Sequence, residues 1–169
     1  EYVQLIPYGK TNEDRPLMLA VISDPSNMAN IEEIRKDNMR KVGFESGASG
    51  TNVTFVWISC SVHGNEPSGS ESSMKTIYEL VNPNNSSSKS WLKNSVVLID
   101  ISVNPDGYSR YTNWFKQVGH AQPNHQPESR EHQEPWPGGR VNHYYFDLNR
   151  DWAWLSQIES QQRIAEYKK

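Results

Sequence analysis

Three short apolar runs, each followed by turn residues, constrain the fold of this chain more than any other feature. They are RPLMLAVIS at 15–23, VTFVWIS at 53–59 and SVVLIDISV at 95–103. Short apolar runs bounded by Asp, Pro, Gly or Asn are typical of β-strands. The run at 53–59 lacks the alternation of a half-exposed strand, so we expect it to be buried on both faces of a sheet.

Segments with helical spacing lie between and after these strands. Apolar residues recur on one face from 31 to 42, and Asn30 with Glu33 predicts an Asn version of the capping box at the start of that helix. Further helices are predicted around 74–81 and from 155 to the last residue. Strands that alternate with helices predict an α/β fold with helices on both faces of the sheet.

The composition limits the size and class of the protein. At 169 residues the chain is one domain, or a piece of a larger one. The apolar share is only 35%, but six Trp and eight Tyr are present, so we expect a core built more from aromatic than from Leu side chains. The net charge of −3, with mixed signs, does not favour a nucleic-acid partner. No window reaches the roughly 18 apolar residues of a membrane span.

The cysteine content and the two ends of the chain add a few expectations. The single Cys60 excludes an internal disulfide and a thiolate-rich zinc site. Glu1 is not preceded by a signal peptide and is typical of a mature or trimmed terminus, and we expect a secreted or periplasmic protein. The last predicted helix has no stop signal, so the chain is expected to be truncated there.

Polar turns follow the predicted strands where α/β proteins bind ligands. His63 and Glu66 come after the strand at 53–59, NPDG at 104–107 follows the next strand, and DLNRDW at 147–152 supplies a further polar turn. In open α/β sheets, ligands bind beyond the carboxyl ends of the strands. These turns therefore predict a functional site at one edge of the sheet.

His63 and Glu66 are candidates for a metal site. Zinc binds imidazole nitrogen and carboxylate oxygen readily, and two His plus one Glu with an open water position is a known catalytic set. A separation of three positions across a tight turn lets both side chains point to one place. The alternative is a polar loop at the edge of a sheet, because an isolated H-x-x-E pair is a weak signal.

Two arginines near the other turns are candidates for binding a carboxylate or a carbonyl. Arg150 follows Asn149, and its planar guanidinium matches a carboxylate bidentately. The alternative for Arg150 is a structural ion pair with Asp147 or Asp151. Arg110, just after NPDG, is the second candidate, and its alternative is a surface residue on a loop.

The segment 117–142 is polar, rich in Pro and too long for an ordinary connection. Loops of this length are usually functional or mobile. Its histidines are irregularly spaced, so we interpret them as solvated loop residues rather than a second metal cluster. They are His120, His125 and His132.

The motifs HGNE, NPDGYSR and FDLNRDW, in this order, resemble those of the zinc metallocarboxypeptidases, of which carboxypeptidase A is the type. The sequence is most similar to a bacterial branch with EPWPGGR and NHYYFDLNRDW, and the resemblance extends from the YGK…RPL opening to the last helix. It implies a mixed, mainly parallel sheet with helices on both faces. It also implies that residues 1–169 are a single domain, the N-terminal portion of a zinc peptidase catalytic domain.

The resemblance also implies a role for each matched residue. His63 and Glu66 would be the first two ligands of Zn²⁺. Asn149 and Arg150 would hold the terminal carboxylate of the substrate, and Arg110 would polarise the scissile carbonyl. The family also needs a third zinc ligand, a histidine, and a glutamate general base, and neither can be matched in this sequence.

We therefore expect a zinc-dependent carboxypeptidase-like hydrolase, incomplete in this chain, that removes C-terminal residues from peptides by means of a metal-activated water. Its partner would be a peptide or acylated amino acid with a free carboxylate. Two alternatives stay open. One is a zinc amidase or deacylase acting on N-acyl amino acids or cell-wall peptides, and the other is a non-catalytic carboxylate-binding domain.

Overall fold

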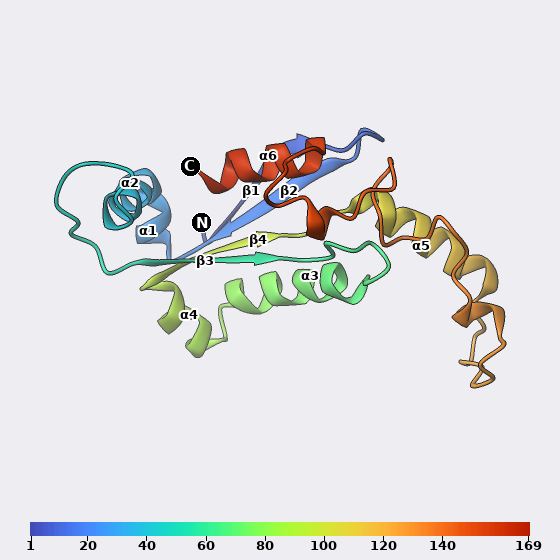
Figure 1. The fold of residues 1–169 in the computed structure, drawn as a ribbon. Helices are drawn as coiled ribbons and strands as arrows, with labels where there is room; N and C mark the ends of the chain where they lie inside the picture. Colours follow the sequence, from blue (N-terminus) through green and yellow to red (C-terminus); the bar gives the residue numbers. More distant parts are fainter.

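The computed structural model describes residues 1–169, which form a four-stranded mixed sheet with helices on both faces (Figure 1). In chain order the elements are β1 (Val3–Lys10), β2 (Pro16–Ile22), α1 (Pro25–Ala29), α2 (Ile31–Lys41), β3 (Thr54–Ser59), α3 (Ser68–Val81), α4 (Ser86–Leu92), β4 (Ser95–Asp100), α5 (Pro105–Val118), η1 (Arg130–His132), η2 (Leu148–Arg150) and α6 (Ile158–Tyr167). None of these helices combines the length and apolarity needed to cross a lipid bilayer.

The strand order of the sheet is β1-β2-β4-β3. The β1–β2 and β2–β4 pairs are antiparallel, and only β3 and β4 run parallel. The parallel pair arises because the connection between β3 and β4 is a crossover that contains α3 and α4, whereas a short turn joins β1 to β2. The predicted mixed α/β sheet is confirmed, but within these four strands antiparallel pairing predominates.

The core consists of two apolar layers, one on each face of the sheet. Successive side chains of β2 and β4 alternate between the faces, so these central strands contribute to both layers. On one face, residues of α3 and α4 pack against Ala20, Ile22, Val97 and Ile99. On the other, α2 packs against Leu19, Val21 and Val96. The fully buried apolar residues are all aliphatic, so the expectation of an aromatic core is wrong.

The strand β3 lies at the edge of the sheet rather than inside it. Val56 is 41% exposed and Ile58 is 39% exposed. The prediction that this strand is buried on both faces is therefore wrong for this chain. Exposed and half-buried residues alternate along β3, so one of its two faces is open although the apolar run itself does not alternate.

The predicted helices are present, with differences at their ends. Asn30 precedes α2 as predicted, but its side-chain amide donates to the carbonyl of Ser26, 2.9 Å away, and makes no cap bond. The capping box does not form because α1 ends directly before Asn30, and the Asn30 side chain is hydrogen-bonded to a residue of that helix. The last helix is shorter than predicted, since α6 begins at Ile158.

The parallel pair β3 and β4 brings two motif-bearing turns to one edge of the sheet. HGNE follows the end of β3, and Asn104 begins α5 shortly after the end of β4. The backbone N–H of Asn104 donates to the carbonyl of Ser61 at 3.2 Å, which ties the two turns together. After α5 and the long loop, the chain returns to the same edge before entering α6 (Figure 1).

Candidate functional site

Three glycines allow the turns at this edge to pack backbone against backbone. A Cβ on Gly64 would lie 2.0 Å from the backbone nitrogen of Tyr108 and 2.6 Å from the carbonyl oxygen of Gly139. A Cβ on Gly107 would lie 2.2 Å from the same Gly139 oxygen. No side chain fits between these segments, so HGNE, NPDG and the PGGR stretch are held in direct contact.

His63 and Glu66 point towards each other across the turn after β3. The Nδ1 of His63 lies 3.3 Å from Oε1 of Glu66. The imidazole is buried, whereas the Glu66 side chain is 63% exposed. The other ring nitrogen, Nε2, is 3.0 Å from Oδ1 of Asp147. Both ring nitrogens face a carboxylate, but Nδ1 also faces a donor, Arg140 Nη1, at 3.4 Å. We therefore assign the proton to Nε2 and the lone pair to Nδ1.

Asp147 links His63 to Arg140, a residue that the sequence motifs did not single out. Oδ2 of Asp147 accepts from Arg140 Nη2 at 2.9 Å and from Nε at 3.2 Å, and Oδ1 accepts from the backbone N–H of Asn149 at 2.9 Å. Burial opposes ionisation of Asp147, but the hydrogen bond from His63 and these other contacts lower its pKa overall. The carboxylate is thus charged at neutral pH and fixes the orientation of the ring, as a second-shell partner of a metal ligand does.

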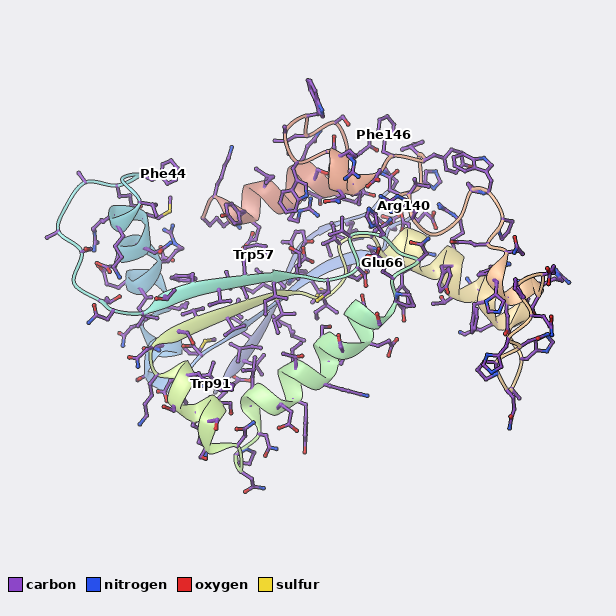
Figure 2. The ribbon with its side chains drawn as sticks, turned by 60° about the horizontal axis from the view of Figure 1, so that its bottom comes forward. Phe44, Trp57, Glu66, Trp91, Arg140 and Phe146 are labelled. Carbon is purple, nitrogen blue, oxygen red and sulfur yellow. The ribbon has the colours of Figure 1, made fainter.

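Arg140 lies beside His63 as well. Its Nη1 is 3.4 Å from Nδ1 of the ring, and Figure 2 shows Arg140 near Glu66 beyond the end of β3. The imidazole nitrogen that faces Glu66 therefore also faces a guanidinium. A metal ion held through Nδ1 would require Arg140 to move aside. The only sequence signal for Arg140 was its place in the PGGR stretch before DLNRDW.

Arg110 does not lie in the same cluster. Its Nη1 donates to the carbonyl oxygens of Pro137, Gly138 and Val141 at 3.2, 2.8 and 3.2 Å, and its Nη2 donates to that of Asn142 at 3.1 Å. These bonds occupy the guanidinium with backbone groups. Nη1 and Nη2 of Arg110 thus donate to backbone carbonyls in this structure, and the role of Arg110 in polarising a substrate carbonyl stays a prediction.

Asn149 and Arg150 lie in the short helix η2, and both side chains are exposed. The structure does not support an ion pair between Arg150 and either neighbouring aspartate. Asp147 is hydrogen-bonded to His63 and Arg140. Asp151 accepts from the backbone N–H groups of Ser156 and Gln157 at 2.9 Å each. The Arg150 guanidinium is thus free to bind a ligand, and its assignment to a carboxylate stays a prediction.

The side chains around His63 are of the types that bind zinc, but there are too few of them for a complete site. An imidazole nitrogen and a carboxylate oxygen converge, and the second ring nitrogen is anchored. No group of three or more His, Cys, Asp or Glu side chains that could hold a metal ion is present. His120, His125 and His132 are exposed loop residues, as interpreted from the sequence.

We expect the 169-residue chain to bind zinc far more weakly than the nanomolar range, because a catalytic zinc site normally has three protein ligands. Calorimetry with Zn²⁺ measures this affinity, and His63→Ala should remove the residual binding. His132→Ala, which removes an exposed loop imidazole, is the matched control and should change nothing. Nanomolar affinity that is lost in the loop variant would contradict the assignment, because a loop histidine would then be a ligand.

The sequence of this chain and its fold are both similar to those of carboxypeptidases. The sequence model of the zinc carboxypeptidase family matches residues 1–168. A metallo-carboxypeptidase from Burkholderia cenocepacia is 15% identical, with a TM-score of 0.61 over 99% of this chain and 34% of that chain. A candidate carboxypeptidase from Burkholderia mallei is 17% identical, with a TM-score of 0.59 over 99% of this chain and 32% of that one. A candidate carboxypeptidase A from Shewanella denitrificans is 16% identical, with a TM-score of 0.58 and coverage of 98% and 31%.

At such low identities the solved structures establish the fold alone, and the chain spans about a third of the length of these proteins. No curated protein sequence matches the chain. The family model, by contrast, matches nearly every residue. The chain therefore belongs to the zinc carboxypeptidase family.

Proposed function

We propose that the protein containing this chain is a zinc-dependent metallocarboxypeptidase that removes C-terminal residues from peptides. The observation that carries the proposal is the arrangement around His63. Its Nδ1 faces Glu66 at 3.3 Å while its Nε2 is held by Asp147 at 3.0 Å. This is the orientation that a histidine ligand needs, and a purely structural histidine would not require the converging Glu66.

His63 and Glu66 would hold the metal, together with a ligand from elsewhere in the protein. When bound, zinc would supply Lewis-acid activation of a water and of the scissile carbonyl. Asp147 keeps the His63 ring in the tautomer that has its lone pair on Nδ1. Arg140 would donate to the carbonyl oxygen as charge develops there. This assignment is supported by the position of its guanidinium beside His63, whereas Nη1 and Nη2 of Arg110 contact backbone carbonyls.

Asn149 and Arg150 would bind the free carboxylate of the substrate. Both precede Asp151 in a turn that Asp147 caps through the N–H of Asn149, so their backbone is tied to the His63 cluster. The exposed guanidinium of Arg150, which extends from this turn, can form a bidentate contact with a carboxylate. Recognition of a free terminus would make the enzyme an exopeptidase. An amidase or deacylase of acylated amino acids would use the same contact.

In the complete enzyme, we expect Arg150→Ala to lower kcat/KM on peptides with a free C-terminus about ten- to a hundredfold. The lost contact is charge-assisted, and such contacts contribute roughly 1.5–3 kcal/mol. Amidated peptides should be poor substrates already and should lose much less. Arg150→Lys should recover only part of the activity, because it retains the charge without the planar fork.

The measurement is the ratio of activities on free and amidated peptides, alongside a panel of acylated amino acids. Arg130→Ala is the matched control, because Arg130 is exposed in the long loop and should leave the ratio unchanged. Equal losses on both kinds of peptide would mean that Arg150 is not the anchor. Turnover confined to acylated amino acids would favour the amidase alternative instead.

A further inference from the structure

The segment 137–147, which we call the carrier segment, has no helix or strand of its own, yet it carries two residues of the His63 cluster. Arg140 and Asp147 both project from it. An irregular segment can place side chains accurately only if other elements fix its backbone. The contacts of the carrier segment therefore determine how well the site is preorganised.

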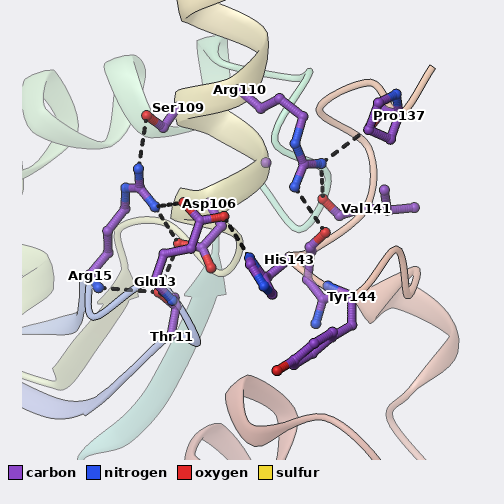
Figure 3. Close-up of polar contacts among 12 residues, drawn as sticks. Thr11, Glu13, Arg15, Asp106, Ser109, Arg110, Pro137, Val141, His143 and Tyr144 are labelled. Carbon is purple, nitrogen blue, oxygen red and sulfur yellow. Dashed lines mark hydrogen bonds and ion pairs between the residues drawn. The ribbon is translucent and has the colours of Figure 1, made fainter.

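Arg110 supplies four of the hydrogen bonds that hold the first part of the carrier segment, while Asn104 Nδ2 donates to the carbonyl of Arg140 and Glu134 accepts from the N–H of Gly139. Arg110 projects from α5 and donates to the carbonyls of Pro137, Gly138, Val141 and Asn142 (Figure 3). These carbonyls lie on both sides of Arg140 in the sequence. Hydrogen bonds from a charged donor are the stronger kind, and the rigid fork of a guanidinium can fix several acceptors relative to one another.

The guanidinium of Arg110 also supports an aromatic contact in the second part of the carrier segment. Its Cζ lies 5.9 Å from the centroid of the Tyr145 ring. Tyr145 packs in turn against Trp136, with ring centroids 5.4 Å apart. Arg110 thus contacts the carrier segment both before and after its midpoint.

The helix that bears Arg110 is itself anchored at its start. Asp106, in the first turn of α5, is buried and accepts from Thr11 Oγ1 at 2.7 Å and from Arg15 at 2.8 Å. These two residues lie in and next to the turn between β1 and β2. The same turn reaches the carrier segment directly, because Glu13 lies 3.0 Å from Nδ1 of His143 (Figure 3).

Asn142 provides a fixed point in the middle of the carrier segment. It is fully buried, and its side-chain oxygen accepts from the backbone N–H groups of Tyr144 and Phe146 at 3.0 Å each. Its amide donates to Gln157 at 2.9 Å, next to α6. Because Arg110 binds the carbonyl of this same residue, the carrier segment is held between α5 and α6.

We propose that Arg110 is a positioning residue that fixes the carrier segment so that Arg140 and Asp147 reach His63. Without it, the carbonyls on both sides of Arg140 lose their shared donor, and the segment opens locally while α5 and the sheet stay folded. Arg140 then no longer lies beside His63, and Asp147 holds the ring less firmly. The consequence for catalysis rests on the proposed function, whereas the positioning itself does not.

Limited proteolysis of the 169-residue chain tests the positioning. Trypsin cleavage between Arg140 and Val141, followed by mass spectrometry, should be at least about tenfold faster in Arg110→Ala, because the segment opens more often. Arg110→Lys should be intermediate, and Arg130→Ala should match the wild type. Cleavage after Lys75, in α3, is the internal control and should not change, since general unfolding would accelerate both cuts alike.

The ring of His63 gives a second measurement that a merely stabilising residue would not affect. Its ¹⁵N resonances report which nitrogen carries the proton. In the wild type the proton should lie on Nε2, and in Arg110→Ala the ring should populate both tautomers. Unchanged cleavage after Arg140 together with an unchanged His63 tautomer would overturn the proposal, as would equal acceleration of the cuts after Arg140 and Lys75.

In the complete enzyme, Arg110→Ala should lower kcat about tenfold or more while KM for free-carboxylate substrates changes less than about threefold, because Arg150 is left in place. A rise in KM without loss of kcat would contradict the assignment. If the complete enzyme has neither peptidase nor amidase activity, the proposed function fails. The proteolysis and the His63 resonances would still decide the role of Arg110.

Discussion

Replacing Gly64 with alanine is expected to destabilise the protein by about 3 kcal/mol or more and to separate the turns that form the His63 cluster. Overpacking usually costs about 1–3 kcal/mol. Here the new methyl group would meet backbone rather than flexible side chains, at 2.0 Å from the nitrogen of Tyr108 and 2.1 Å from the carbonyl carbon of Gly107. Urea unfolding measures the change in the free energy of unfolding.

Gly50→Ala is the matched control for this experiment. A Cβ at Gly50 would have no atom within 4 Å, so its free energy of unfolding should stay within about 0.5 kcal/mol of the wild type. The residual zinc binding of Gly64→Ala should also disappear, because His63 and Glu66 flank the displaced residue. Similar losses in the two variants would mean that the turns are not in backbone contact.

Between pH 5 and pH 8 we expect the free energy of unfolding to fall by about 2–3 kcal/mol because of Asp100. Asp100 is fully buried, and burial raises its pKa from 3.8 to about 7, against the effects of the Tyr8 hydroxyl and the nearby charge of Arg163. The folded state therefore keeps a proton that the unfolded state has already released. Stability is fully present below about pH 4 and is lost as the pH rises towards 7.

Asp100→Asn should remove most of this pH dependence. The amide oxygen can still accept from Tyr8, which lies 3.0 Å from the carboxylate, but the group cannot ionise. A smaller slope of the same sign should remain, because burial also raises the pKa of Glu159. Asp14→Asn, at a side chain that is 89% exposed, should keep the wild-type slope. A flat wild-type profile, or a profile of Asp100→Asn as steep as that of the wild type, would refute the assignment to Asp100.

Local patterns predicted the elements that depend on short apolar runs or helical spacing. The runs at 15–23, 53–59 and 95–103 became β2, β3 and β4, and the edge where the site lies follows from the parallel pairing of the last two. The strand β1 was missed because Pro7 interrupts it and much of it is exposed. The helix α5 was missed because Asn104 and Pro105 also form turns, and here they cap and begin a helix.

The residues that complete the site could not be found in the same way. Asp147 and His63 are 84 positions apart, and Arg140 and His63 are 77 apart. Their contacts depend on the return of the chain after a long loop without periodicity. An arginine that follows a turn, such as Arg110, is exposed as far as the sequence can indicate, whereas the carbonyls to which it donates come from a distant segment. Candidate residues could thus be found from short motifs, but their contacts with residues far away in the sequence could not.

The two outer edges of the sheet differ in how they resist unwanted strand addition. Along β1, Pro7 removes a donor and a bulge between Pro7 and Gly9 breaks the regular ladder. The outer edge of β3 has neither device, and its sequence TFVWIS is uncharged and rich in β-branched and aromatic residues. An edge of this kind is a template for amyloid-like stacking between molecules. The solubility of the 169-residue chain at high concentration therefore depends on whether this edge is covered.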